Sequence, residues 1–197
     1  MNKTHFFKIA LLLVMSLGSI AIVGGSFNLN PSLFKQAFNN DGRSERITDV
    51  SRYEEIRSSI WSQQELVKHF PAVISSNASN TKFIYYPGNL QGGSFLQLKM
   101  KLPQTRIKQL LAQYRQISQR KYQGGNTNDH LNQKDGLPTT FFYTGDDDVE
   151  SFPPTYEILV LGARDKGNAS FKWNHGNSYG IAIDRFASEI VYWAEVW

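Results

Sequence analysis

The feature that most constrains this chain is an uninterrupted apolar segment near its N-terminus. Residues 9–23 read IALLLVMSLGSIAIV and contain no charged side chain, while Lys3 and Lys8 precede them. A basic start followed by an apolar run is typical of a segment that directs a chain into a membrane. Because backbone polar groups in lipid must pair within the segment, the run is expected to insert as a helix. The sequence therefore predicts an N-terminal transmembrane or signal helix.

The length of this segment does not decide whether it is cleaved off or retained as an anchor. Residues 9–23 suit the apolar core of a cleaved signal peptide, and residues 24–26 extend the run close to the length that spans a bilayer. Small side chains permit cleavage after Ala21 or after Gly25, although neither site has the alanine pattern typical of signal peptides. Both a retained anchor and a cleaved signal are therefore compatible with the sequence.

The positive charge before the apolar run predicts how the chain is oriented. Lysines at this place favour a cytoplasmic N-terminus and an exported C-terminal part. We expect a signal peptide or anchor at residues 1–26, with membrane contact through residues 9–26. A linker rich in Asn and Ser follows at residues 27–48, and one extracytoplasmic domain at residues 49–197. The domain is thus expected in the periplasm, or outside the cell if the signal is cleaved.

Composition narrows the chemistry of that domain. The chain has no cysteine, which excludes disulfides, thiolate metal sites, cysteine nucleophiles and a lipoprotein anchor. Its net charge of +4 comes partly from the two leader lysines, so we expect no nucleic-acid partner. No two of the four histidines stand at metal-ligand spacing, and we expect neither a metal site nor a cofactor. Aromatic residues make up 13% of the chain, enough for a real core.

Periodicity over the rest of the chain predicts an α+β fold. Residues 96–102 alternate between apolar and polar side chains, as in an antiparallel strand with one buried face. Residues 103–120 open with a proline and carry an apolar stripe at helical spacing. Residues 156–161 are continuously apolar and are expected to form a central strand. Further strands are expected at 82–86, 179–184 and 190–196, and short helices at 51–70. Their order predicts a mostly antiparallel sheet of about five strands, with two or three helices packed on one face.

Two short motifs suggest chemistry that their surroundings do not support. Residues 176–180 match the G-x-S-x-G pattern of a nucleophile elbow, but strand-like residues follow and no histidine comes later. Residues 145–150 carry three aspartates and Glu150, which could offer oxygen ligands to calcium. Their spacing does not fit an EF-hand loop, and a solvated acidic loop is the simpler interpretation. Calcium binding by this segment stays open.

Polar and aromatic side chains gather in the last quarter of the chain. Trp173, Asn174 and His175 form a loop before a strand, and Trp193 lies in the last strand. Aromatic side chains often line a groove for a protein, peptide or glycan ligand. We therefore assign these four as candidate binding residues, with His175 the strongest of them. The alternative is a hydrogen-bond network that only orders the loop. His69, before Phe-Pro at a helix end, is expected to have a structural role.

Four stretches of the domain resemble uncharacterised exported or membrane-anchored bacterial proteins. These are residues 69–71, 86–93, 173–183 and 190–195, and the resemblance covers about residues 65–197. It implies a bacterial envelope setting and carries no activity, cofactor or site.

These observations together predict an envelope protein, membrane-anchored or secreted, whose domain is a non-catalytic binding or interaction module. We assign no catalytic residue. The alternative is a small hydrolase that uses the loop around His175 and the acidic segment at residues 146–150.

Overall fold

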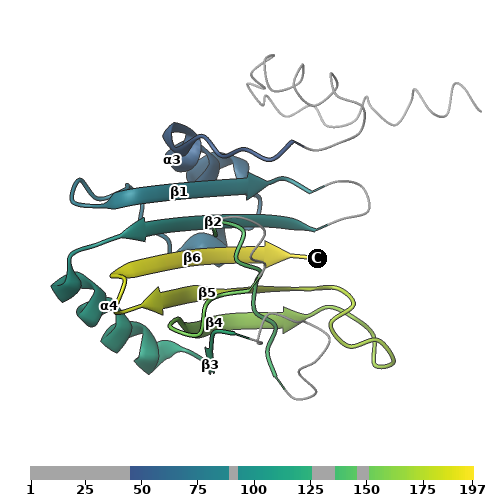
Figure 1. The fold of residues 1–197 in the computed structure, drawn as a ribbon. Coiled ribbons are helices and arrows are strands. Elements are labelled where there is room, and N and C mark those ends of the chain that lie inside the picture. Colours follow the sequence, from purple (N-terminus) through teal and green to yellow (C-terminus); the bar gives the residue numbers. More distant parts are fainter. Residues whose placement is uncertain (1–44, 89–92, 126–135, 146–150) are drawn as a thin grey trace, which may run out of the picture. The chain divides into compact units, whose positions relative to one another are not determined.

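A computed structural model describes residues 45–88, 93–125, 136–145 and 151–197, within a compact unit that spans Gly42–Trp197 (Figure 1). In this part of the chain, six strands form one antiparallel sheet in the order β1-β2-β6-β5-β4-β3. The α+β class and the antiparallel sheet are therefore confirmed. The strands are β1 (Ser79–Tyr86), β2 (Ser94–Lys101), β3 (Arg120–Gln123), β4 (Glu157–Asp165), β5 (Gly176–Asp184) and β6 (Glu189–Val196).

The sheet consists of two antiparallel groups joined by their inner strands. The β1–β2 hairpin forms the first group. In the second group, β4 pairs with β5 and β5 pairs with β6. The two groups meet where β2 pairs with β6, from Ser94↔Val196 to Lys101↔Glu189. The apolar run expected at the centre of the sheet is β4, which lies second from the edge, so that prediction was wrong. Its continuous apolar character has another cause, because both faces of the sheet are covered there.

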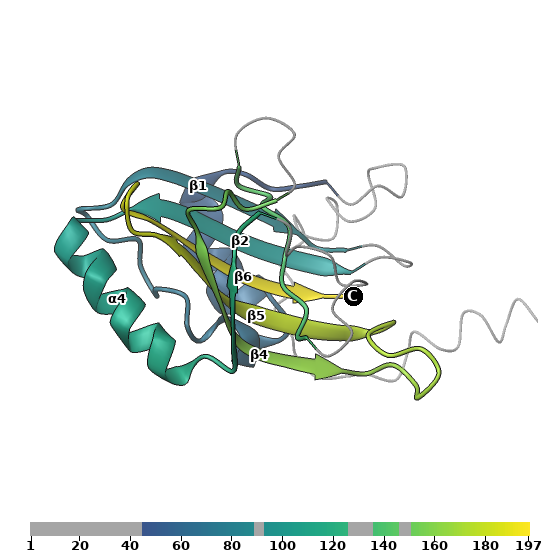
Figure 2. The same ribbon diagram turned by 60° about the horizontal axis from the view of Figure 1, so that its bottom comes forward.

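The first face of the sheet is covered by helical elements. These are η1 (Val50–Arg52), α3 (Tyr53–Glu55), the π-helical turn η2 (Ile56–Ile60), the 3₁₀ turn η3 (Gln64–Val67) and α4 (Gln104–Ile117). Ile107, Leu110 and Leu111 of α4 share one core with residues from η3 and from β1, β2, β4, β5 and β6. Figure 2 shows α4 beside the strands. The helix ends three residues earlier than expected, because the chain turns into the short edge strand β3, which periodicity did not reveal.

The second face is covered by irregular chain, which the sequence did not predict. We call residues 136–145 the strap, and Figure 1 shows this connection crossing in front of the strands. Phe142 of the strap packs with Phe152 and Tyr156 in a second apolar cluster. Ile158 and Trp193 contribute to the same cluster from β4 and β6. The sheet is therefore enclosed on both sides.

The predicted leader lies outside the residues that the structure describes, together with most of the predicted linker. Within the described ranges, no helix has the length and apolarity required to cross a membrane. The end of the predicted linker is part of the domain, because Ile47 and Tyr85 exchange two backbone hydrogen bonds of 2.8 Å. This bridge extends the sheet beyond β1 at one position.

Candidate functional site

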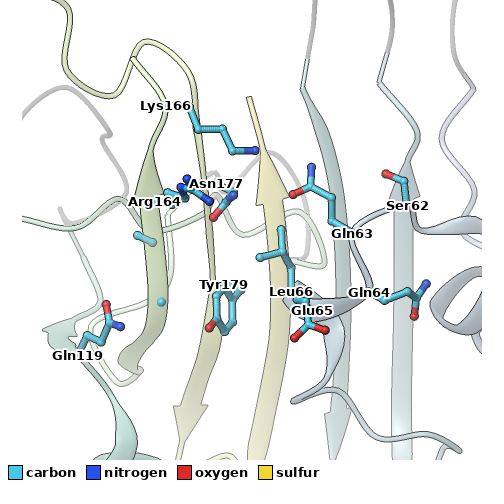
Figure 3. A pocket seen from close by; sticks show the side chains of 12 residues that line it. Ser62, Gln63, Gln64, Glu65, Leu66, Gln119, Arg164, Lys166, Asn177 and Tyr179 are labelled. Carbon is cyan, nitrogen blue, oxygen red and sulfur yellow. The ribbon is translucent and has the colours of Figure 1, made fainter. Parts of the chain in front are cut away.

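A polar groove opens on the helical face of the sheet, between η3 and the outer ends of β4 and β5 (Figure 3). It encloses about 520 Å³. Its lining comes from η3 and the residues before it, from the segment that follows α4, and from β4 and β5. The lining residues are Ser62, Gln63, Gln64, Glu65, Leu66, Gln119, Gly162, Ala163, Arg164, Lys166, Asn177 and Tyr179.

The floor of the groove depends on a close contact between Tyr179 and Gly162. These residues face each other across β5 and β4. A Cβ atom added at Gly162 would lie 2.6 Å from three atoms at the end of the Tyr179 side chain. Only glycine leaves room for the ring to lie over β4 in this position. The ring thereby supplies a flat, partly exposed surface at the bottom of a polar groove.

One side of the groove is positively charged. Arg164 and Lys166 are exposed near the end of β4, and Arg164 pairs with Asn177 of β5 across the ladder. Glu65 is the one lining residue with a carboxylate, and it forms an ion pair with Lys68 at 2.7 Å. Figure 3 shows the two cations and Asn177 on one side of the groove, with Ser62 and Gln63 on the other. The groove therefore favours an anionic ligand.

The opposite side is held in place by Trp61. The buried indole donates from Nε1 to the backbone oxygen of Gln63 at 3.0 Å, and Gln64 Nε2 donates to the Trp61 oxygen at 2.6 Å. Leu66 and Val67 turn inward to the core. As a result, the amide side chain of Gln63 projects from a turn with a defined backbone, which the Gln64 amide helps to fix.

His69 anchors η3 to the sheet beside the floor. Its Nε2 lies 2.9 Å from the carbonyl oxygen of Gly180, so this nitrogen carries the proton and donates it. Its own carbonyl accepts a hydrogen bond of 3.1 Å from the Tyr114 hydroxyl, and its ring lies 5.5 Å from that of Tyr179. Burial lowers the pKa of His69 to about 4, against the opposing effect of its backbone hydrogen bonds. At neutral pH the ring is therefore an uncharged structural element.

Three of the four predicted binding residues lie together in the loop between β4 and β5. Asn174 and His175 are exposed, and Trp173 is half-buried with a φ of 59°. Asp165 Oδ1 accepts the backbone N–H of Trp173 at 3.0 Å, and Trp197 Nε1 donates to the Trp173 oxygen at 2.7 Å. These bonds order the loop, which agrees with the alternative interpretation of this segment.

Trp193, the fourth predicted residue, is separated from that loop. It is fully buried on the second face of the sheet, where its ring covers Gly180. A Cβ atom at Gly180 would lie 2.6 Å from that ring. The structure therefore does not bring the four predicted residues into one site. The G-x-S-x-G match also lies within a strand, with Ser178 buried in β5 and its Oγ 3.4 Å from the Thr139 oxygen.

A second polar group, which the sequence did not reveal, lies beneath the strap. Gln97 of β2 donates to the Phe141 oxygen at 2.9 Å, and its Oε1 accepts both the backbone N–H and the hydroxyl of Thr144 at 2.8 Å. Tyr143 donates to Glu195 Oε1 at 3.1 Å. Burial raises the pKa of Glu195 to about 7, although its side-chain hydrogen bonds lower it. These buried polar side chains attach the strap to the sheet.

Little in the sequence pointed to the groove. Its cationic residues belong to the end of a strand that was expected to stop at Leu161, and its other side is a run of amides beside Trp61. The acidic segment at residues 146–150 lies outside the described residues. Among the residues that are described, no group of histidine, aspartate and glutamate side chains could hold a metal ion.

The comparisons with known proteins leave the function to be argued from this geometry. No family model, no curated protein and no solved structure matches the chain.

Proposed function

We propose that this protein is a non-catalytic binding module of the bacterial cell envelope. In this proposal the groove beside η3 captures a short polar ligand that carries negative charge. The observation that supports it best is the pair of exposed cations, Arg164 and Lys166, at one side of an open groove of about 520 Å³. The envelope setting is supported by the apolar run at residues 9–23 and by the lysines before it. The domain would then be anchored in the periplasm, or secreted.

The lining suits recognition of such a ligand. A guanidinium group offers a planar pair of donors that matches a carboxylate, and an ammonium group adds a mobile point charge. The amides of Gln63 and Asn177 both donate and accept, so they accommodate polar groups of either kind. The Tyr179 ring adds an apolar surface against which a ligand packs. Charge, amides and an aromatic floor thus occur together within one groove.

The same lining argues against catalysis in the groove. General acid–base chemistry requires a positioned proton donor and acceptor, and nucleophilic catalysis requires a base beside the nucleophile. The twelve lining residues include no histidine. Their one carboxylate, Glu65, is exposed and paired with Lys68. We therefore assign binding, and no catalytic step, to the groove.

Binding of two labelled probes to the full-length protein tests this proposal. The probes are a fluorescein-labelled peptide of four Val-Glu repeats and a fluorescein-labelled oligogalacturonate, followed by fluorescence anisotropy. We expect at least one probe to bind, with about tenfold lower affinity for a protein carrying Arg164→Gln and Lys166→Gln.

The matched control carries Lys108→Gln and Arg185→Gln, which remove the same charge from exposed positions outside the groove. It should bind as the unchanged protein does. Absence of binding by both probes, or an equal loss in the two double variants, would contradict the proposal.

A further inference from the structure

The groove ends at a stretch of strand edge that no described strand occupies. β3 pairs with β4 only from Arg120↔Val160 to Gln123↔Glu157. Beyond this pairing the register shifts at Leu161, and residues 162–165 of β4 continue with β5 on their other side. In the described ranges, the outer half of β4 therefore has one strand neighbour instead of two. Gly162, Ala163 and Arg164, which line the groove, belong to this half.

Backbone hydrogen bonds show which groups point outward along this edge. The Lys166 N–H donates to the His175 oxygen at 2.7 Å and so faces the β5 side. Along an antiparallel strand, successive residues direct their N–H and C=O groups to opposite sides. Ala163 and Asp165 therefore direct their backbone N–H and C=O groups away from β5. Gly176, which faces Asp165, agrees with this, because it exchanges both of its backbone hydrogen bonds with Trp197.

Side chains at this edge divide between the two faces of the sheet. Arg164 pairs with Asn177 and shares the groove face with it, whereas Ala163 pairs with the buried Ser178 on the second face. A strand added here would place every second side chain beside Arg164 and Lys166. The residues between would present their N–H and C=O groups to Ala163 and Asp165. The edge thus offers a backbone template and a charge preference on the same face.

We propose that the groove binds an extended acidic peptide segment, which adds to the outer half of β4 as an antiparallel strand. This inference rests on the proposed function of the groove and specifies its ligand. The available edge accommodates about four residues at ~3.4 Å each. β3 occupies the neighbouring half of the same edge in the same direction, and the Gln119 N–H before it donates to the Val160 oxygen at 2.9 Å.

A peptide fits this edge better than a glycan does. Strand addition derives affinity from a regular ladder of main-chain hydrogen bonds, and pockets for alternate side chains provide specificity. Ala163 and Asp165 present such a ladder, since each offers one donor and one acceptor to the outside. The exposed cations favour glutamate or aspartate at the alternate positions. Sugar hydroxyls lack the matching repeat of donors and acceptors.

Selective N-methylation of the Val-Glu probe tests strand addition. Residues directly opposite each other in an antiparallel pair have their side chains on the same face. With glutamates beside Arg164, the valine N–H groups must point to Ala163 and Asp165, and the glutamate N–H groups must point away. We therefore expect N-methylation of the valines to lower affinity for the full-length protein about tenfold. N-methylation of the glutamates should leave it nearly unchanged.

The two methylated peptides have the same composition and charge, so each is the control for the other. An equal effect of both methylations, whether no loss or the same loss, overturns strand addition. If Arg164→Gln with Lys166→Gln still weakens binding in that case, the groove proposal stands. Binding of oligogalacturonate without any binding of the parent peptide likewise overturns the peptide inference and leaves the groove proposal intact.

Discussion

Glu195 offers the most direct test of the energetics of this fold. The carboxyl group is buried between β6 and the strap, with 8% of the residue exposed, and accepts a hydrogen bond from Tyr143. Burial disfavours the charged form and raises the pKa of Glu195 from its ordinary value of 4.5 to about 7. Glutamine has nearly the same shape, carries no charge and keeps an oxygen acceptor. We therefore expect Glu195→Gln to stabilise the protein at alkaline pH.

The magnitude follows from the difference between the folded and unfolded pKa values. Between pH 4.5 and about 7, the folded state keeps the proton of Glu195 while the unfolded state loses it. Stability is then fully present below the unfolded pKa and falls as pH rises towards the folded pKa. A shift of this size corresponds to about 3 kcal/mol, because one pKa unit is about 1.4 kcal/mol. Above the folded pKa the loss is constant.

Urea unfolding at several pH values provides the assay. The free energy of unfolding is measured for the unchanged protein and for Glu195→Gln from about pH 4 to about pH 8.5. The difference between the two should be near zero at the acid end and grow to about 3 kcal/mol at the alkaline end. All other groups titrate in both proteins, so the difference isolates Glu195. Parallel stability curves, or a gap that narrows as pH rises, would refute the reasoning.

Two further predictions concern the floor of the groove and the residue beside it. Gly162→Ala should lower stability by about 1 kcal/mol, because the new Cβ meets the end of the partly exposed Tyr179 side chain at 2.6 Å and the ring has to move aside. In a Tyr179→Ala background most of this cost should vanish in a double-mutant cycle, and an undiminished cost there would show that the clash is not the cause. For His69, whose pKa is about 4 when folded and 6.5 ordinarily, stability should fall as pH decreases from 6.5 towards 4. In the same urea assay, the free energy of unfolding of His69→Gln should decrease by about 3 kcal/mol less over this pH range than that of the unchanged protein. An equal decrease in both proteins would count against a buried neutral ring.

Local patterns predicted most of the secondary structure. Alternation identified β2 within two residues of its observed start and one of its end, and the apolar stripe at helical spacing identified α4. Both patterns arise from neighbours in the chain, since alternate or helically spaced residues share one face of an element. Neighbouring residues of a strand likewise point to opposite faces, and Tyr192 and Trp193 of β6 belong to separate apolar clusters.

Structural features that depend on residues distant in the sequence were predicted less well. β3 is four residues long and has no alternation of its own, and it forms a strand because β4 lies beside it. β4 was expected at the centre of the sheet because it is apolar on both faces. The strap covers its second face instead of a second layer of helices. Irregular chain has no periodic pattern of apolar residues, so the sequence of the strap does not indicate that it packs on the sheet.

The sequence by itself determined the class of the fold, the order of its main elements and the apolar faces of β2 and α4. These properties follow from side-chain spacing along a single element. The sequence did not determine that the polar face of β2 is covered too, with Gln97 and Lys99 buried.

Tertiary structure alone decided that Arg164 and Lys166 share a groove with Gln63 and that half of β4 has an open edge. It also decided that Glu195 and His69 are buried deeply enough to shift their pKa values. These three features have the same physical cause. A groove, a free edge and a desolvated charge each depend on residues brought together from distant parts of the chain.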